Sequence, residues 1–156
     1  LHCCGRNIDA KEGDNLYWEV ARRHNLRTIL EQRPHLIIQG ETAGPGIQKN
    51  LLKLNEKQLF VFSVFDRKAN RYYGDTEMRA FCAETGLTPV PLLYEGEAFA
   101  ETRESLLGKA EGKYLGTNND REGIVVRTKE PVYSTTLCGR LSFKVINNSF
   151  LLKQKD

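Results

Sequence analysis

The sequence has few of the features that mark a membrane, secreted or disordered protein. No apolar run approaches the roughly 20 residues that cross a bilayer, and no signal-peptide pattern opens the sequence. Its four cysteines match neither a metal site nor a disulfide framework in their spacing: Cys3, Cys4, Cys82 and Cys138. We therefore expect reduced thiols and a cytoplasmic, intracellular protein with no membrane partner.

Neither sign of charge dominates the composition. The formal net charge is +3 at pH 7, with 28% charged and 40% hydrophobic residues. These values are typical of a globular chain, and 156 residues can bury the core of one domain. The small positive excess permits a nucleic-acid partner without indicating one, because phosphate binding depends on clustered charge.

Strand-like and helix-like segments follow one another without strict alternation. Strands are predicted at 1–6, 35–41, 59–65, 89–94, 122–128 and 141–146, the last resuming at 150–153. Helices are predicted after caps at Asp14, Thr76 and Thr102, with stops at Gly86 and Gly112 for the last two. We therefore expect an α+β fold of mostly antiparallel strands with flanking helices.

The opening run LHCCGR already has the character of an apolar strand. A domain rarely begins inside a strand. We therefore expect residues 1–156 to form a single domain that lacks its N-terminal part.

A glycine-rich turn follows an apolar strand in IIQGETAGPGIQKN (37–50). Glu41 lies at the exit of this strand, beside the sharp turn that the glycines allow. The segment matches no glycine-rich phosphate fingerprint. Glu41 is therefore either a binding group at the end of the strand or a solvated carboxylate on a turn.

The segment LFVFSVFD (59–66) has apolar side chains on both faces of the expected strand. Strict alternation predicts two sets that point in opposite directions: Phe60, Phe62 and Val64, and Val61, Ser63 and Phe65. Such a strand is either packed on both sides or presents an aromatic face to a ligand. Base stacking on an aromatic ring is worth about 1–3 kcal/mol.

The strand REGIVVR (121–127) contains a carboxylate in an otherwise apolar run. Alternation places Glu122 on the face of Ile124 and Val126, and Arg127 on the opposite face. A carboxylate directed at a core costs several kcal/mol unless a cation or a metal ion meets it. Glu122 is therefore either a functional group or half of a structural ion pair.

Lys144 interrupts a second apolar strand in LSFKVINNSFLLK (141–153). Its stem either snorkels to the surface or brings the ammonium to a ligand. Together with Glu122 it would suit a metal–phosphate site, in which the carboxylate holds Mg²⁺ and the ammonium holds phosphoryl oxygens.

The order of these segments resembles the motif series of the covalent nucleotidyltransferases. The series is a strand with Arg-Asn, then GE-x-AGPG, an aromatic strand ending in Phe-Asp, EGIVVR and SFKVIN. GETAGPGIQKN and SFKVINN are most similar to the ATP-dependent RNA ligases of the RNA ligase 2-like group. The resemblance covers nearly the whole chain. It implies an ATP-grasp-like nucleotidyltransferase domain that uses ATP and Mg²⁺ to seal RNA 3′-OH and 5′-phosphate ends, as in a nicked duplex.

The resemblance implies a role for each of five residues. Arg6 would contact the nucleotide and the RNA end, Glu41 would help to form the nucleotide pocket, and Phe65 would stack on adenine. Glu122 would handle metal and nucleotide, and Lys144 would contact the AMP phosphate. Arg6, Glu122 and Lys144 form the predicted catalytic set. We expect these groups to converge from separate strands on one nucleotide-binding cleft.

The sequence departs from the family pattern in two places. Some relatives carry a second lysine two residues after Lys144, where this chain has Ile146. The lysine that carries AMP would lie in K-x-[DE]-G upstream of Arg6, so we expect the chain alone to form no lysyl-AMP. KAEG (109–112) matches that motif literally but lies between the third and fourth motifs. Three alternatives stay open: a DNA ligase, a capping guanylyltransferase, and a non-catalytic RNA-binding module.

Overall fold

The computed structural model describes residues 1–153. Its elements are β1 (Cys3–Cys4), β2 (Asp9–Ala10), α1 (Leu16–Arg23), α2 (Leu26–Gln32), β3 (Leu36–Ala43), the short 3-10 helix η1 (Gln48–Asn50), β4 (Gln58–Asp66), β5 (Arg71–Tyr72), α3 (Asp75–Thr85), β6 (Thr88–Pro89), α4 (Arg103–Ala110), β7 (Gly123–Arg127), β8 (Tyr133–Ser134), β9 (Gly139–Arg140), β10 (Ser142–Ile146) and α5 (Asn148–Lys153). Apart from β4 with β6, the strand pairs within these residues are antiparallel. The predicted α+β class is confirmed.

The longest pairing joins β3 to β4, from Leu36 opposite Asp66 to Ala43 opposite Gln58. β5 and β6 extend this sheet from β4. One face of the sheet is covered by apolar side chains of α1, α2 and α3. The buried cluster comprises Val20, Ile29, Leu36, Leu59, Val61, Val64, Met78, Phe81, Cys82 and Leu87. This cluster is the core of the molecule.

The β3–β4 pairing contains a bulge. Gln39 lies opposite Ser63 and Gly40 lies opposite Val61, so Phe62 is an extra residue in β4. A bulge sets two residues of one strand against one of its partner and interrupts the alternation of side chains.

The alternation predicted for β4 is wrong beyond this bulge. Val61 and Val64 are both fully buried in the core, although they are three positions apart and alternation would place them on opposite faces. Phe60 and Phe65 therefore lie together on the other face of the sheet, where they are half-buried. Glu41 is the cross-strand partner of Phe60 and shares that face. We call this the open face of the β3–β4 pair, because the core helices cover the opposite side.

Two helix starts differ slightly from the predicted positions. The side chain of Asn15, not Asp14, accepts a backbone hydrogen bond in the first turn of α1. α3 begins after Gly74, not at a Thr76 cap. The side chain of Thr102 caps α4 as predicted. Neighbouring polar residues can all serve as caps, and only tertiary packing selects among them.

Two predicted strands are wrong. Of the predicted 89–94 strand, only Pro89 pairs with β4, in β6, and Pro91 ends the pairing because it has no backbone donor. The region 150–153 is helical instead, in α5. Asn147 explains this helix, because its side chain accepts a hydrogen bond from the Ser149 backbone amide at 2.9 Å.

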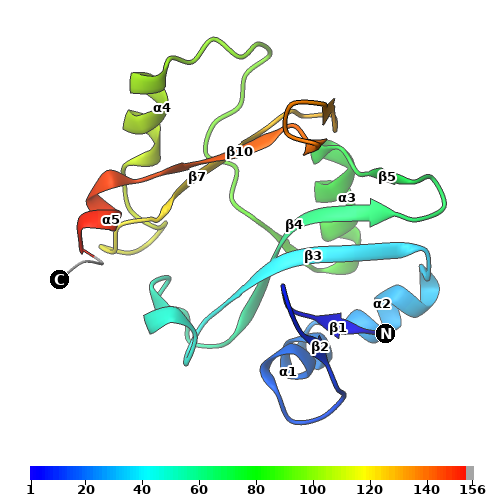
Figure 1. Ribbon diagram of the computed structural model, residues 1–156. Coiled ribbons are helices and arrows are strands. Elements are labelled where there is room, and N and C mark those ends of the chain that lie inside the picture. Colours follow the sequence, from blue (N-terminus) through cyan, green and yellow to red (C-terminus); the bar gives the residue numbers. More distant parts are fainter. Residues whose placement is uncertain (154–156) are drawn as a thin grey trace.

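The second layer is the antiparallel β7–β10 pair, which runs from Gly123 opposite Ile146 to Arg127 opposite Ser142. α4 packs against both strands. Figure 1 shows β7, β10 and α4 on one side of the β3–β4 pair and α1 and α2 on the other. Among residues 1–153, no helix is long and apolar enough to span a membrane.

Candidate functional site

Lys144 and Glu122 are in direct contact. The Lys144 Nζ donates to the Glu122 Oε1 at 2.5 Å, and both side chains are about half exposed, at 45% and 47%. The β7–β10 pairing places Lys144 opposite Val125, three residues after the glutamate. The structure therefore brings together the acid and the base that were predicted from the sequence.

The backbone around Glu122 is held by neighbouring polar groups. The Asn147 backbone amide donates to the Glu122 carbonyl at 2.9 Å, and the Asn147 side chain donates to the Arg121 carbonyl at 2.9 Å. The Arg121 guanidinium donates to the carbonyls of Ala110 at 3.2 Å and Glu111 at 2.8 Å, at the C-terminal end of α4. These bonds fix where the carboxylate enters the site.

The predicted orientation of Glu122 is wrong. Its carboxylate does not follow Ile124 and Val126 but meets Lys144, which shares a face with Val125. The reason is Gly123, whose φ of +153° ends the regular alternation before Glu122 is reached. A Cβ at this glycine would lie 2.1 Å from the Val145 carbonyl oxygen, so the close approach of β10 requires glycine.

The face of β7 that carries Val125 and Arg127 is directed at β4. The Arg127 Nη1 donates to the Phe62 carbonyl at 2.5 Å and lies 3.3 Å from the Ser63 Oγ. Because Lys144 pairs with Val125, it belongs to the same side of its sheet. The open face of β3–β4 therefore meets the Lys144 face of β7–β10.

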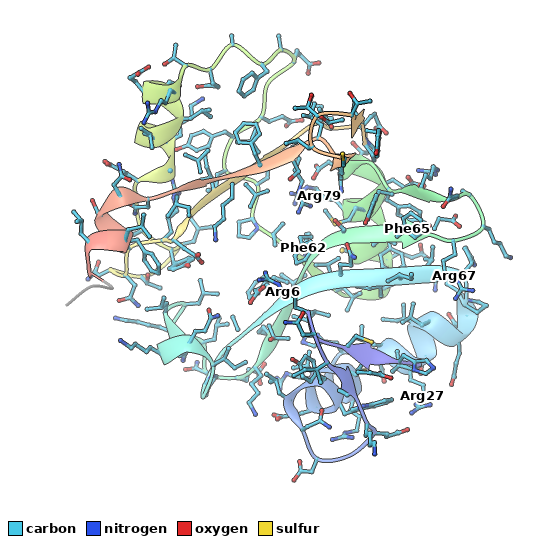
Figure 2. All side chains as sticks on the ribbon, viewed as in Figure 1. Arg6, Arg27, Phe62, Phe65, Arg67 and Arg79 are labelled. Atoms are coloured by element: carbon cyan, nitrogen blue, oxygen red, sulfur yellow. The ribbon has the colours of Figure 1, made fainter. Side chains whose placement is uncertain are left out.

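Glu41 and Phe65 lie on this open face but at separate points. Glu41 is opposite Phe60, and Phe65 is opposite Ile37, four residues away along β3, which corresponds to roughly 13 Å. The Phe65 ring packs edge-on against Tyr72, with centroids 5.0 Å apart. Phe60 and Phe62 lie nearer to Glu41 along β4, and no role was predicted for them from the sequence. Figure 2 labels Phe62 and Phe65 on β4.

The Arg6 side chain makes no hydrogen bond or ion pair within the part of the chain that the structure describes. It follows β1 and is exposed, and Figure 2 shows it projecting from the end of the β1 segment that lies toward β3. The contacts therefore join only two of the predicted residues, Glu122 and Lys144. Glu41 and Phe65 share a face with each other, and that face is opposed to Lys144.

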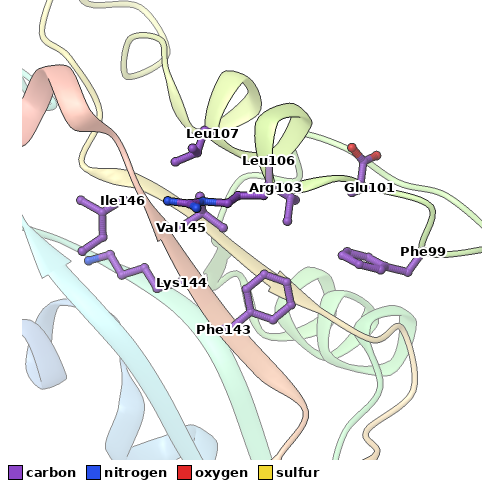
Figure 3. A pocket seen from close by; sticks show the side chains of 9 residues that line it. All are labelled: Phe99, Glu101, Arg103, Leu106, Leu107, Phe143, Lys144, Val145 and Ile146. Carbon is purple, nitrogen blue, oxygen red and sulfur yellow. The ribbon is translucent and has the colours of Figure 1, made fainter.

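An open hollow of about 500 Å³ lies at the free edge of β10, against α4 (Figure 3). Its lining comprises Phe99, Glu101, Arg103, Leu106, Leu107, Phe143, Lys144, Val145 and Ile146. Phe99 and Phe143 meet edge-on with centroids 6.1 Å apart. Of the predicted site residues, only Lys144 contributes to this hollow, so it is not the predicted nucleotide site as a whole.

Lys109, the lysine of KAEG (109–112), contacts groups outside the candidate site. Its ammonium pairs with Glu101 and lies 5.1 Å from the centroid of the Tyr94 ring. Hydrogen bonds from Lys109 and Ser105 lower the pKa of the Glu101 carboxyl. These contacts give Lys109 a structural role on α4.

Glu122 is a lone carboxylate. Within residues 1–153, no three His, Cys, Asp or Glu side chains gather as metal ligands. Mg²⁺ is commonly held by one or two carboxylates together with substrate phosphates and water. The residues present therefore fit a divalent cation only where phosphate oxygens complete its coordination.

Arg127 was not among the site residues predicted from the sequence, although EGIVVR contains it. In the structure Arg127 and Arg140 both contact Ser63, which is 4% exposed. Burial lowers the pKa of both guanidiniums, and the Arg140 charge lowers that of Arg127 further. No local signal marks Arg127, because its contacts depend on the packing of β7 against β4.

The structure as a whole is similar to solved RNA ligases. A mutant of Naegleria gruberi RNA ligase with AMP and manganese superposes with a TM-score of 0.84 at 32% identity, covering 98% of this chain and 45% of that one. The same enzyme with pyrophosphate gives the same values. Another mutant, with ATP and manganese, gives 0.84 at 31% identity, covering 97% of this chain and 45% of that one.

The model of the RNA ligase family matches residues 1–146, and the chain belongs to this family. A comparison with curated proteins finds no match. The chain spans about 45% of the length of the solved relatives.

Proposed function

We propose that this chain is part of the adenylation domain of an ATP-dependent RNA ligase. In the whole protein, a lysine would take AMP from ATP, the AMP would pass to an RNA 5′-phosphate, and an RNA 3′-OH would displace it. The observation that carries the proposal is the Lys144–Glu122 contact, on the side of β7–β10 that faces β3–β4, in a chain of the RNA ligase family.

In this proposal each polar residue has a defined task. The Lys144 ammonium holds the phosphate that becomes AMP and offsets negative charge on it. Glu122 is the chain's carboxylate for a divalent cation, Mg²⁺ in the cell, which supplies charge neutralisation at the phosphates. Glu41 contacts the nucleoside, and Arg6 contacts the nucleotide and the RNA end. Solved relatives with ATP or AMP and manganese support the nucleotide and the divalent cation.

Three aromatic rings are candidates to stack on adenine. The family resemblance assigns Phe65. Phe60 and Phe62 lie on the same face and closer to Glu41. A nucleoside that touches Glu41 reaches these two rings more readily than it reaches Phe65.

We further propose that this chain binds ATP without forming lysyl-AMP. The sequence holds no lysine before Arg6, and Lys109 is paired with Glu101 on α4. A lysine nucleophile must be held close to the α-phosphate, and the ion pair instead holds the Lys109 ammonium against Glu101 on α4.

The experiment is incubation of the chain with Mg²⁺ and α-³²P-labelled ATP or GTP, with binding and covalent label measured separately. We expect ATP to bind in preference to GTP, no label after denaturation, and about tenfold weaker binding in Lys144→Ala than in Lys109→Ala. Preference for GTP would indicate a capping guanylyltransferase. Label that persists in Lys109→Ala after denaturation would contradict the missing-nucleophile account. RNA binding without any nucleotide binding would support the non-catalytic module.

A further inference from the structure

Two arginines from different strands converge on one buried hydroxyl. The Nη1 atoms of Arg127, at the end of β7, and of Arg140, in β9, each lie 3.3 Å from the Ser63 Oγ. A serine hydroxyl has two acceptor lone pairs, so the two guanidiniums use its whole accepting capacity. Two like charges are thus held side by side next to the bulge in β4.

No carboxylate in residues 1–153 bonds to either guanidinium. The neighbouring groups are mainly aromatic: Arg140 lies 5.4 Å from the Tyr72 ring centroid, and Arg127 lies 5.4 Å from that of Phe62. Asp75 acts on both arginines only through its charge, and its carboxylate accepts a hydrogen bond from the Arg79 Nε at 2.8 Å.

One guanidinium donor beside Ser63 has no hydrogen-bond partner. The Arg140 Nε is buried and has no hydrogen-bond partner. Buried donors are nearly always satisfied, and an exception calls for an explanation. Arg127 alone joins the two sheets, because it donates to the Phe62 carbonyl. A purely structural role would therefore not require Arg140 as a second cation, nor a buried donor without a partner.

We propose that Arg127, Arg140 and Ser63 form a second oxyanion site, which binds a phosphate group. Guanidinium forks match phosphate oxygens, and an anion would offset the paired positive charges. The site goes beyond the proposed function, and only the identity of the molecule that carries the phosphate rests on that function.

The site is distinct from the Lys144 contact but lies on the same side of β7–β10. Arg127 follows Val125, the partner of Lys144, by two residues, which corresponds to about 7 Å along the strand. This spacing fits two successive phosphates of one RNA backbone, with one phosphate at each site, whereas free pyrophosphate would occupy one site at a time. The shared chemistry is a phosphate group, and its source is either free pyrophosphate or RNA.

The test follows the Nε–H signal of Arg140 by ¹⁵N NMR during three separate titrations of the chain. The probes are sodium pyrophosphate, a short RNA with a 5′-phosphate, and the same RNA with a 5′-hydroxyl. We expect a saturable shift with pyrophosphate or with RNA. A shift with pyrophosphate alone identifies a free polyphosphate, and a shift with RNA alone identifies the backbone or end phosphate. No shift with any probe would overturn the proposal.

Matched variants test whether the probe binds at Arg127, Arg140 and Ser63. Calorimetric titration measures the variants, because Arg140→Gln lacks the Nε–H signal. Arg140→Gln should weaken binding of the active probe about tenfold, and Arg67→Gln, which changes an exposed arginine without an ion pair in residues 1–153, should leave it unchanged. Ser63→Ala removes only the shared hydroxyl and should also weaken binding, which keeps the test informative if Arg140→Gln fails to fold. Equal binding in Arg140→Gln and Arg67→Gln would contradict the site.

A Lys144→Ala variant separates this proposal from the proposed function. Retained pyrophosphate or RNA binding at Arg140, together with lost ATP binding, supports two distinct sites. If ATP fails to bind even to the unmodified chain while the Arg140 signal still shifts, the ligase function fails and the oxyanion site stands. Loss of the Arg140 shift in Lys144→Ala would overturn the second site.

Discussion

The Lys144 ammonium lies 2.5 Å from the Glu122 carboxylate, although 22 residues separate the two along the chain. The antiparallel β7–β10 pairing creates this contact, and Gly123 allows the close approach of the strands that it needs. Both side chains remain about half exposed. A half-exposed ion pair contributes little to the free energy of folding. We therefore expect these two residues to matter more for ligand binding than for stability.

Replacing Lys144 should affect ligand binding far more than stability. Lys144→Ala should weaken ATP binding about tenfold, because a charge-assisted phosphate contact is lost. The free energy of unfolding should change by less than about 1 kcal/mol, because the ion pair is exposed. Calorimetric titration and urea denaturation measure the two effects. A large loss of stability with unchanged ATP affinity would show that the pair is only structural.

The aromatic rings on the open face should differ in their contribution to nucleotide binding. Loss of a stacking ring costs about 1–3 kcal/mol, or roughly 5- to 150-fold in affinity. Because Phe62 lies nearer to Glu41 than Phe65 does, we expect Phe62→Ala to weaken ATP binding more than Phe65→Ala. The comparison is a calorimetric titration of each variant. A larger effect of Phe65→Ala would instead support the assignment made from the sequence.

Two glycines should respond in opposite ways to alanine. Gly123→Ala should destabilise the protein by about 2 kcal/mol or more, because its Cβ would meet the Val145 carbonyl oxygen at a positive φ. Gly108→Ala, within α4 and with open space around it, should stabilise by about 0.5–1 kcal/mol. Urea unfolding measures both. Equal stability of the two variants would mean that β7 and β10 do not approach as described.

Stability should depend on pH through His24. Burial lowers the pKa of this imidazole from its ordinary value of 6.5, and its Nε2 accepts a hydrogen bond from the Leu59 amide at 3.2 Å. The folded state therefore favours the neutral ring. The stability that the neutral His24 ring contributes is fully present above pH 6.5. It is lost as the pH falls through the lower pKa that His24 has in the folded state.

Urea unfolding at several pH values should show this loss, and His24→Gln should reduce it. A pH dependence that is the same in the variant would assign the effect to other groups.

The sequence was sufficient for features that depend on local pattern. The α+β class, the Thr102 cap, the Gly86 stop and the proximity of Lys144 to Glu122 in one site follow from periodicity and from charges placed in apolar strands, whereas their direct contact was not predicted. The faces of β4 could not be predicted, because the bulge at Phe62 arises from the register with β3. The helix after Asn147 was also missed, because the cap depends on a buried side chain held by Arg121.

The position of the remaining site residues depends on tertiary structure in the same way. Arg127 gained its importance only when β7 was placed against β4. Glu41 and Phe65 share a face because of the bulge, but their roughly 13 Å separation follows from the strand length. No local pattern reports these relations.

A crystal structure of the chain with ATP and Mg²⁺ tests the central claim most directly. The account predicts a nucleotide between the two sheets, with a phosphate on the Lys144 ammonium, the cation on Glu122, the base against a ring of β4 and no covalent bond to the chain. A nucleotide bound only in the hollow between α4 and β10, away from Glu122 and β4, would contradict it.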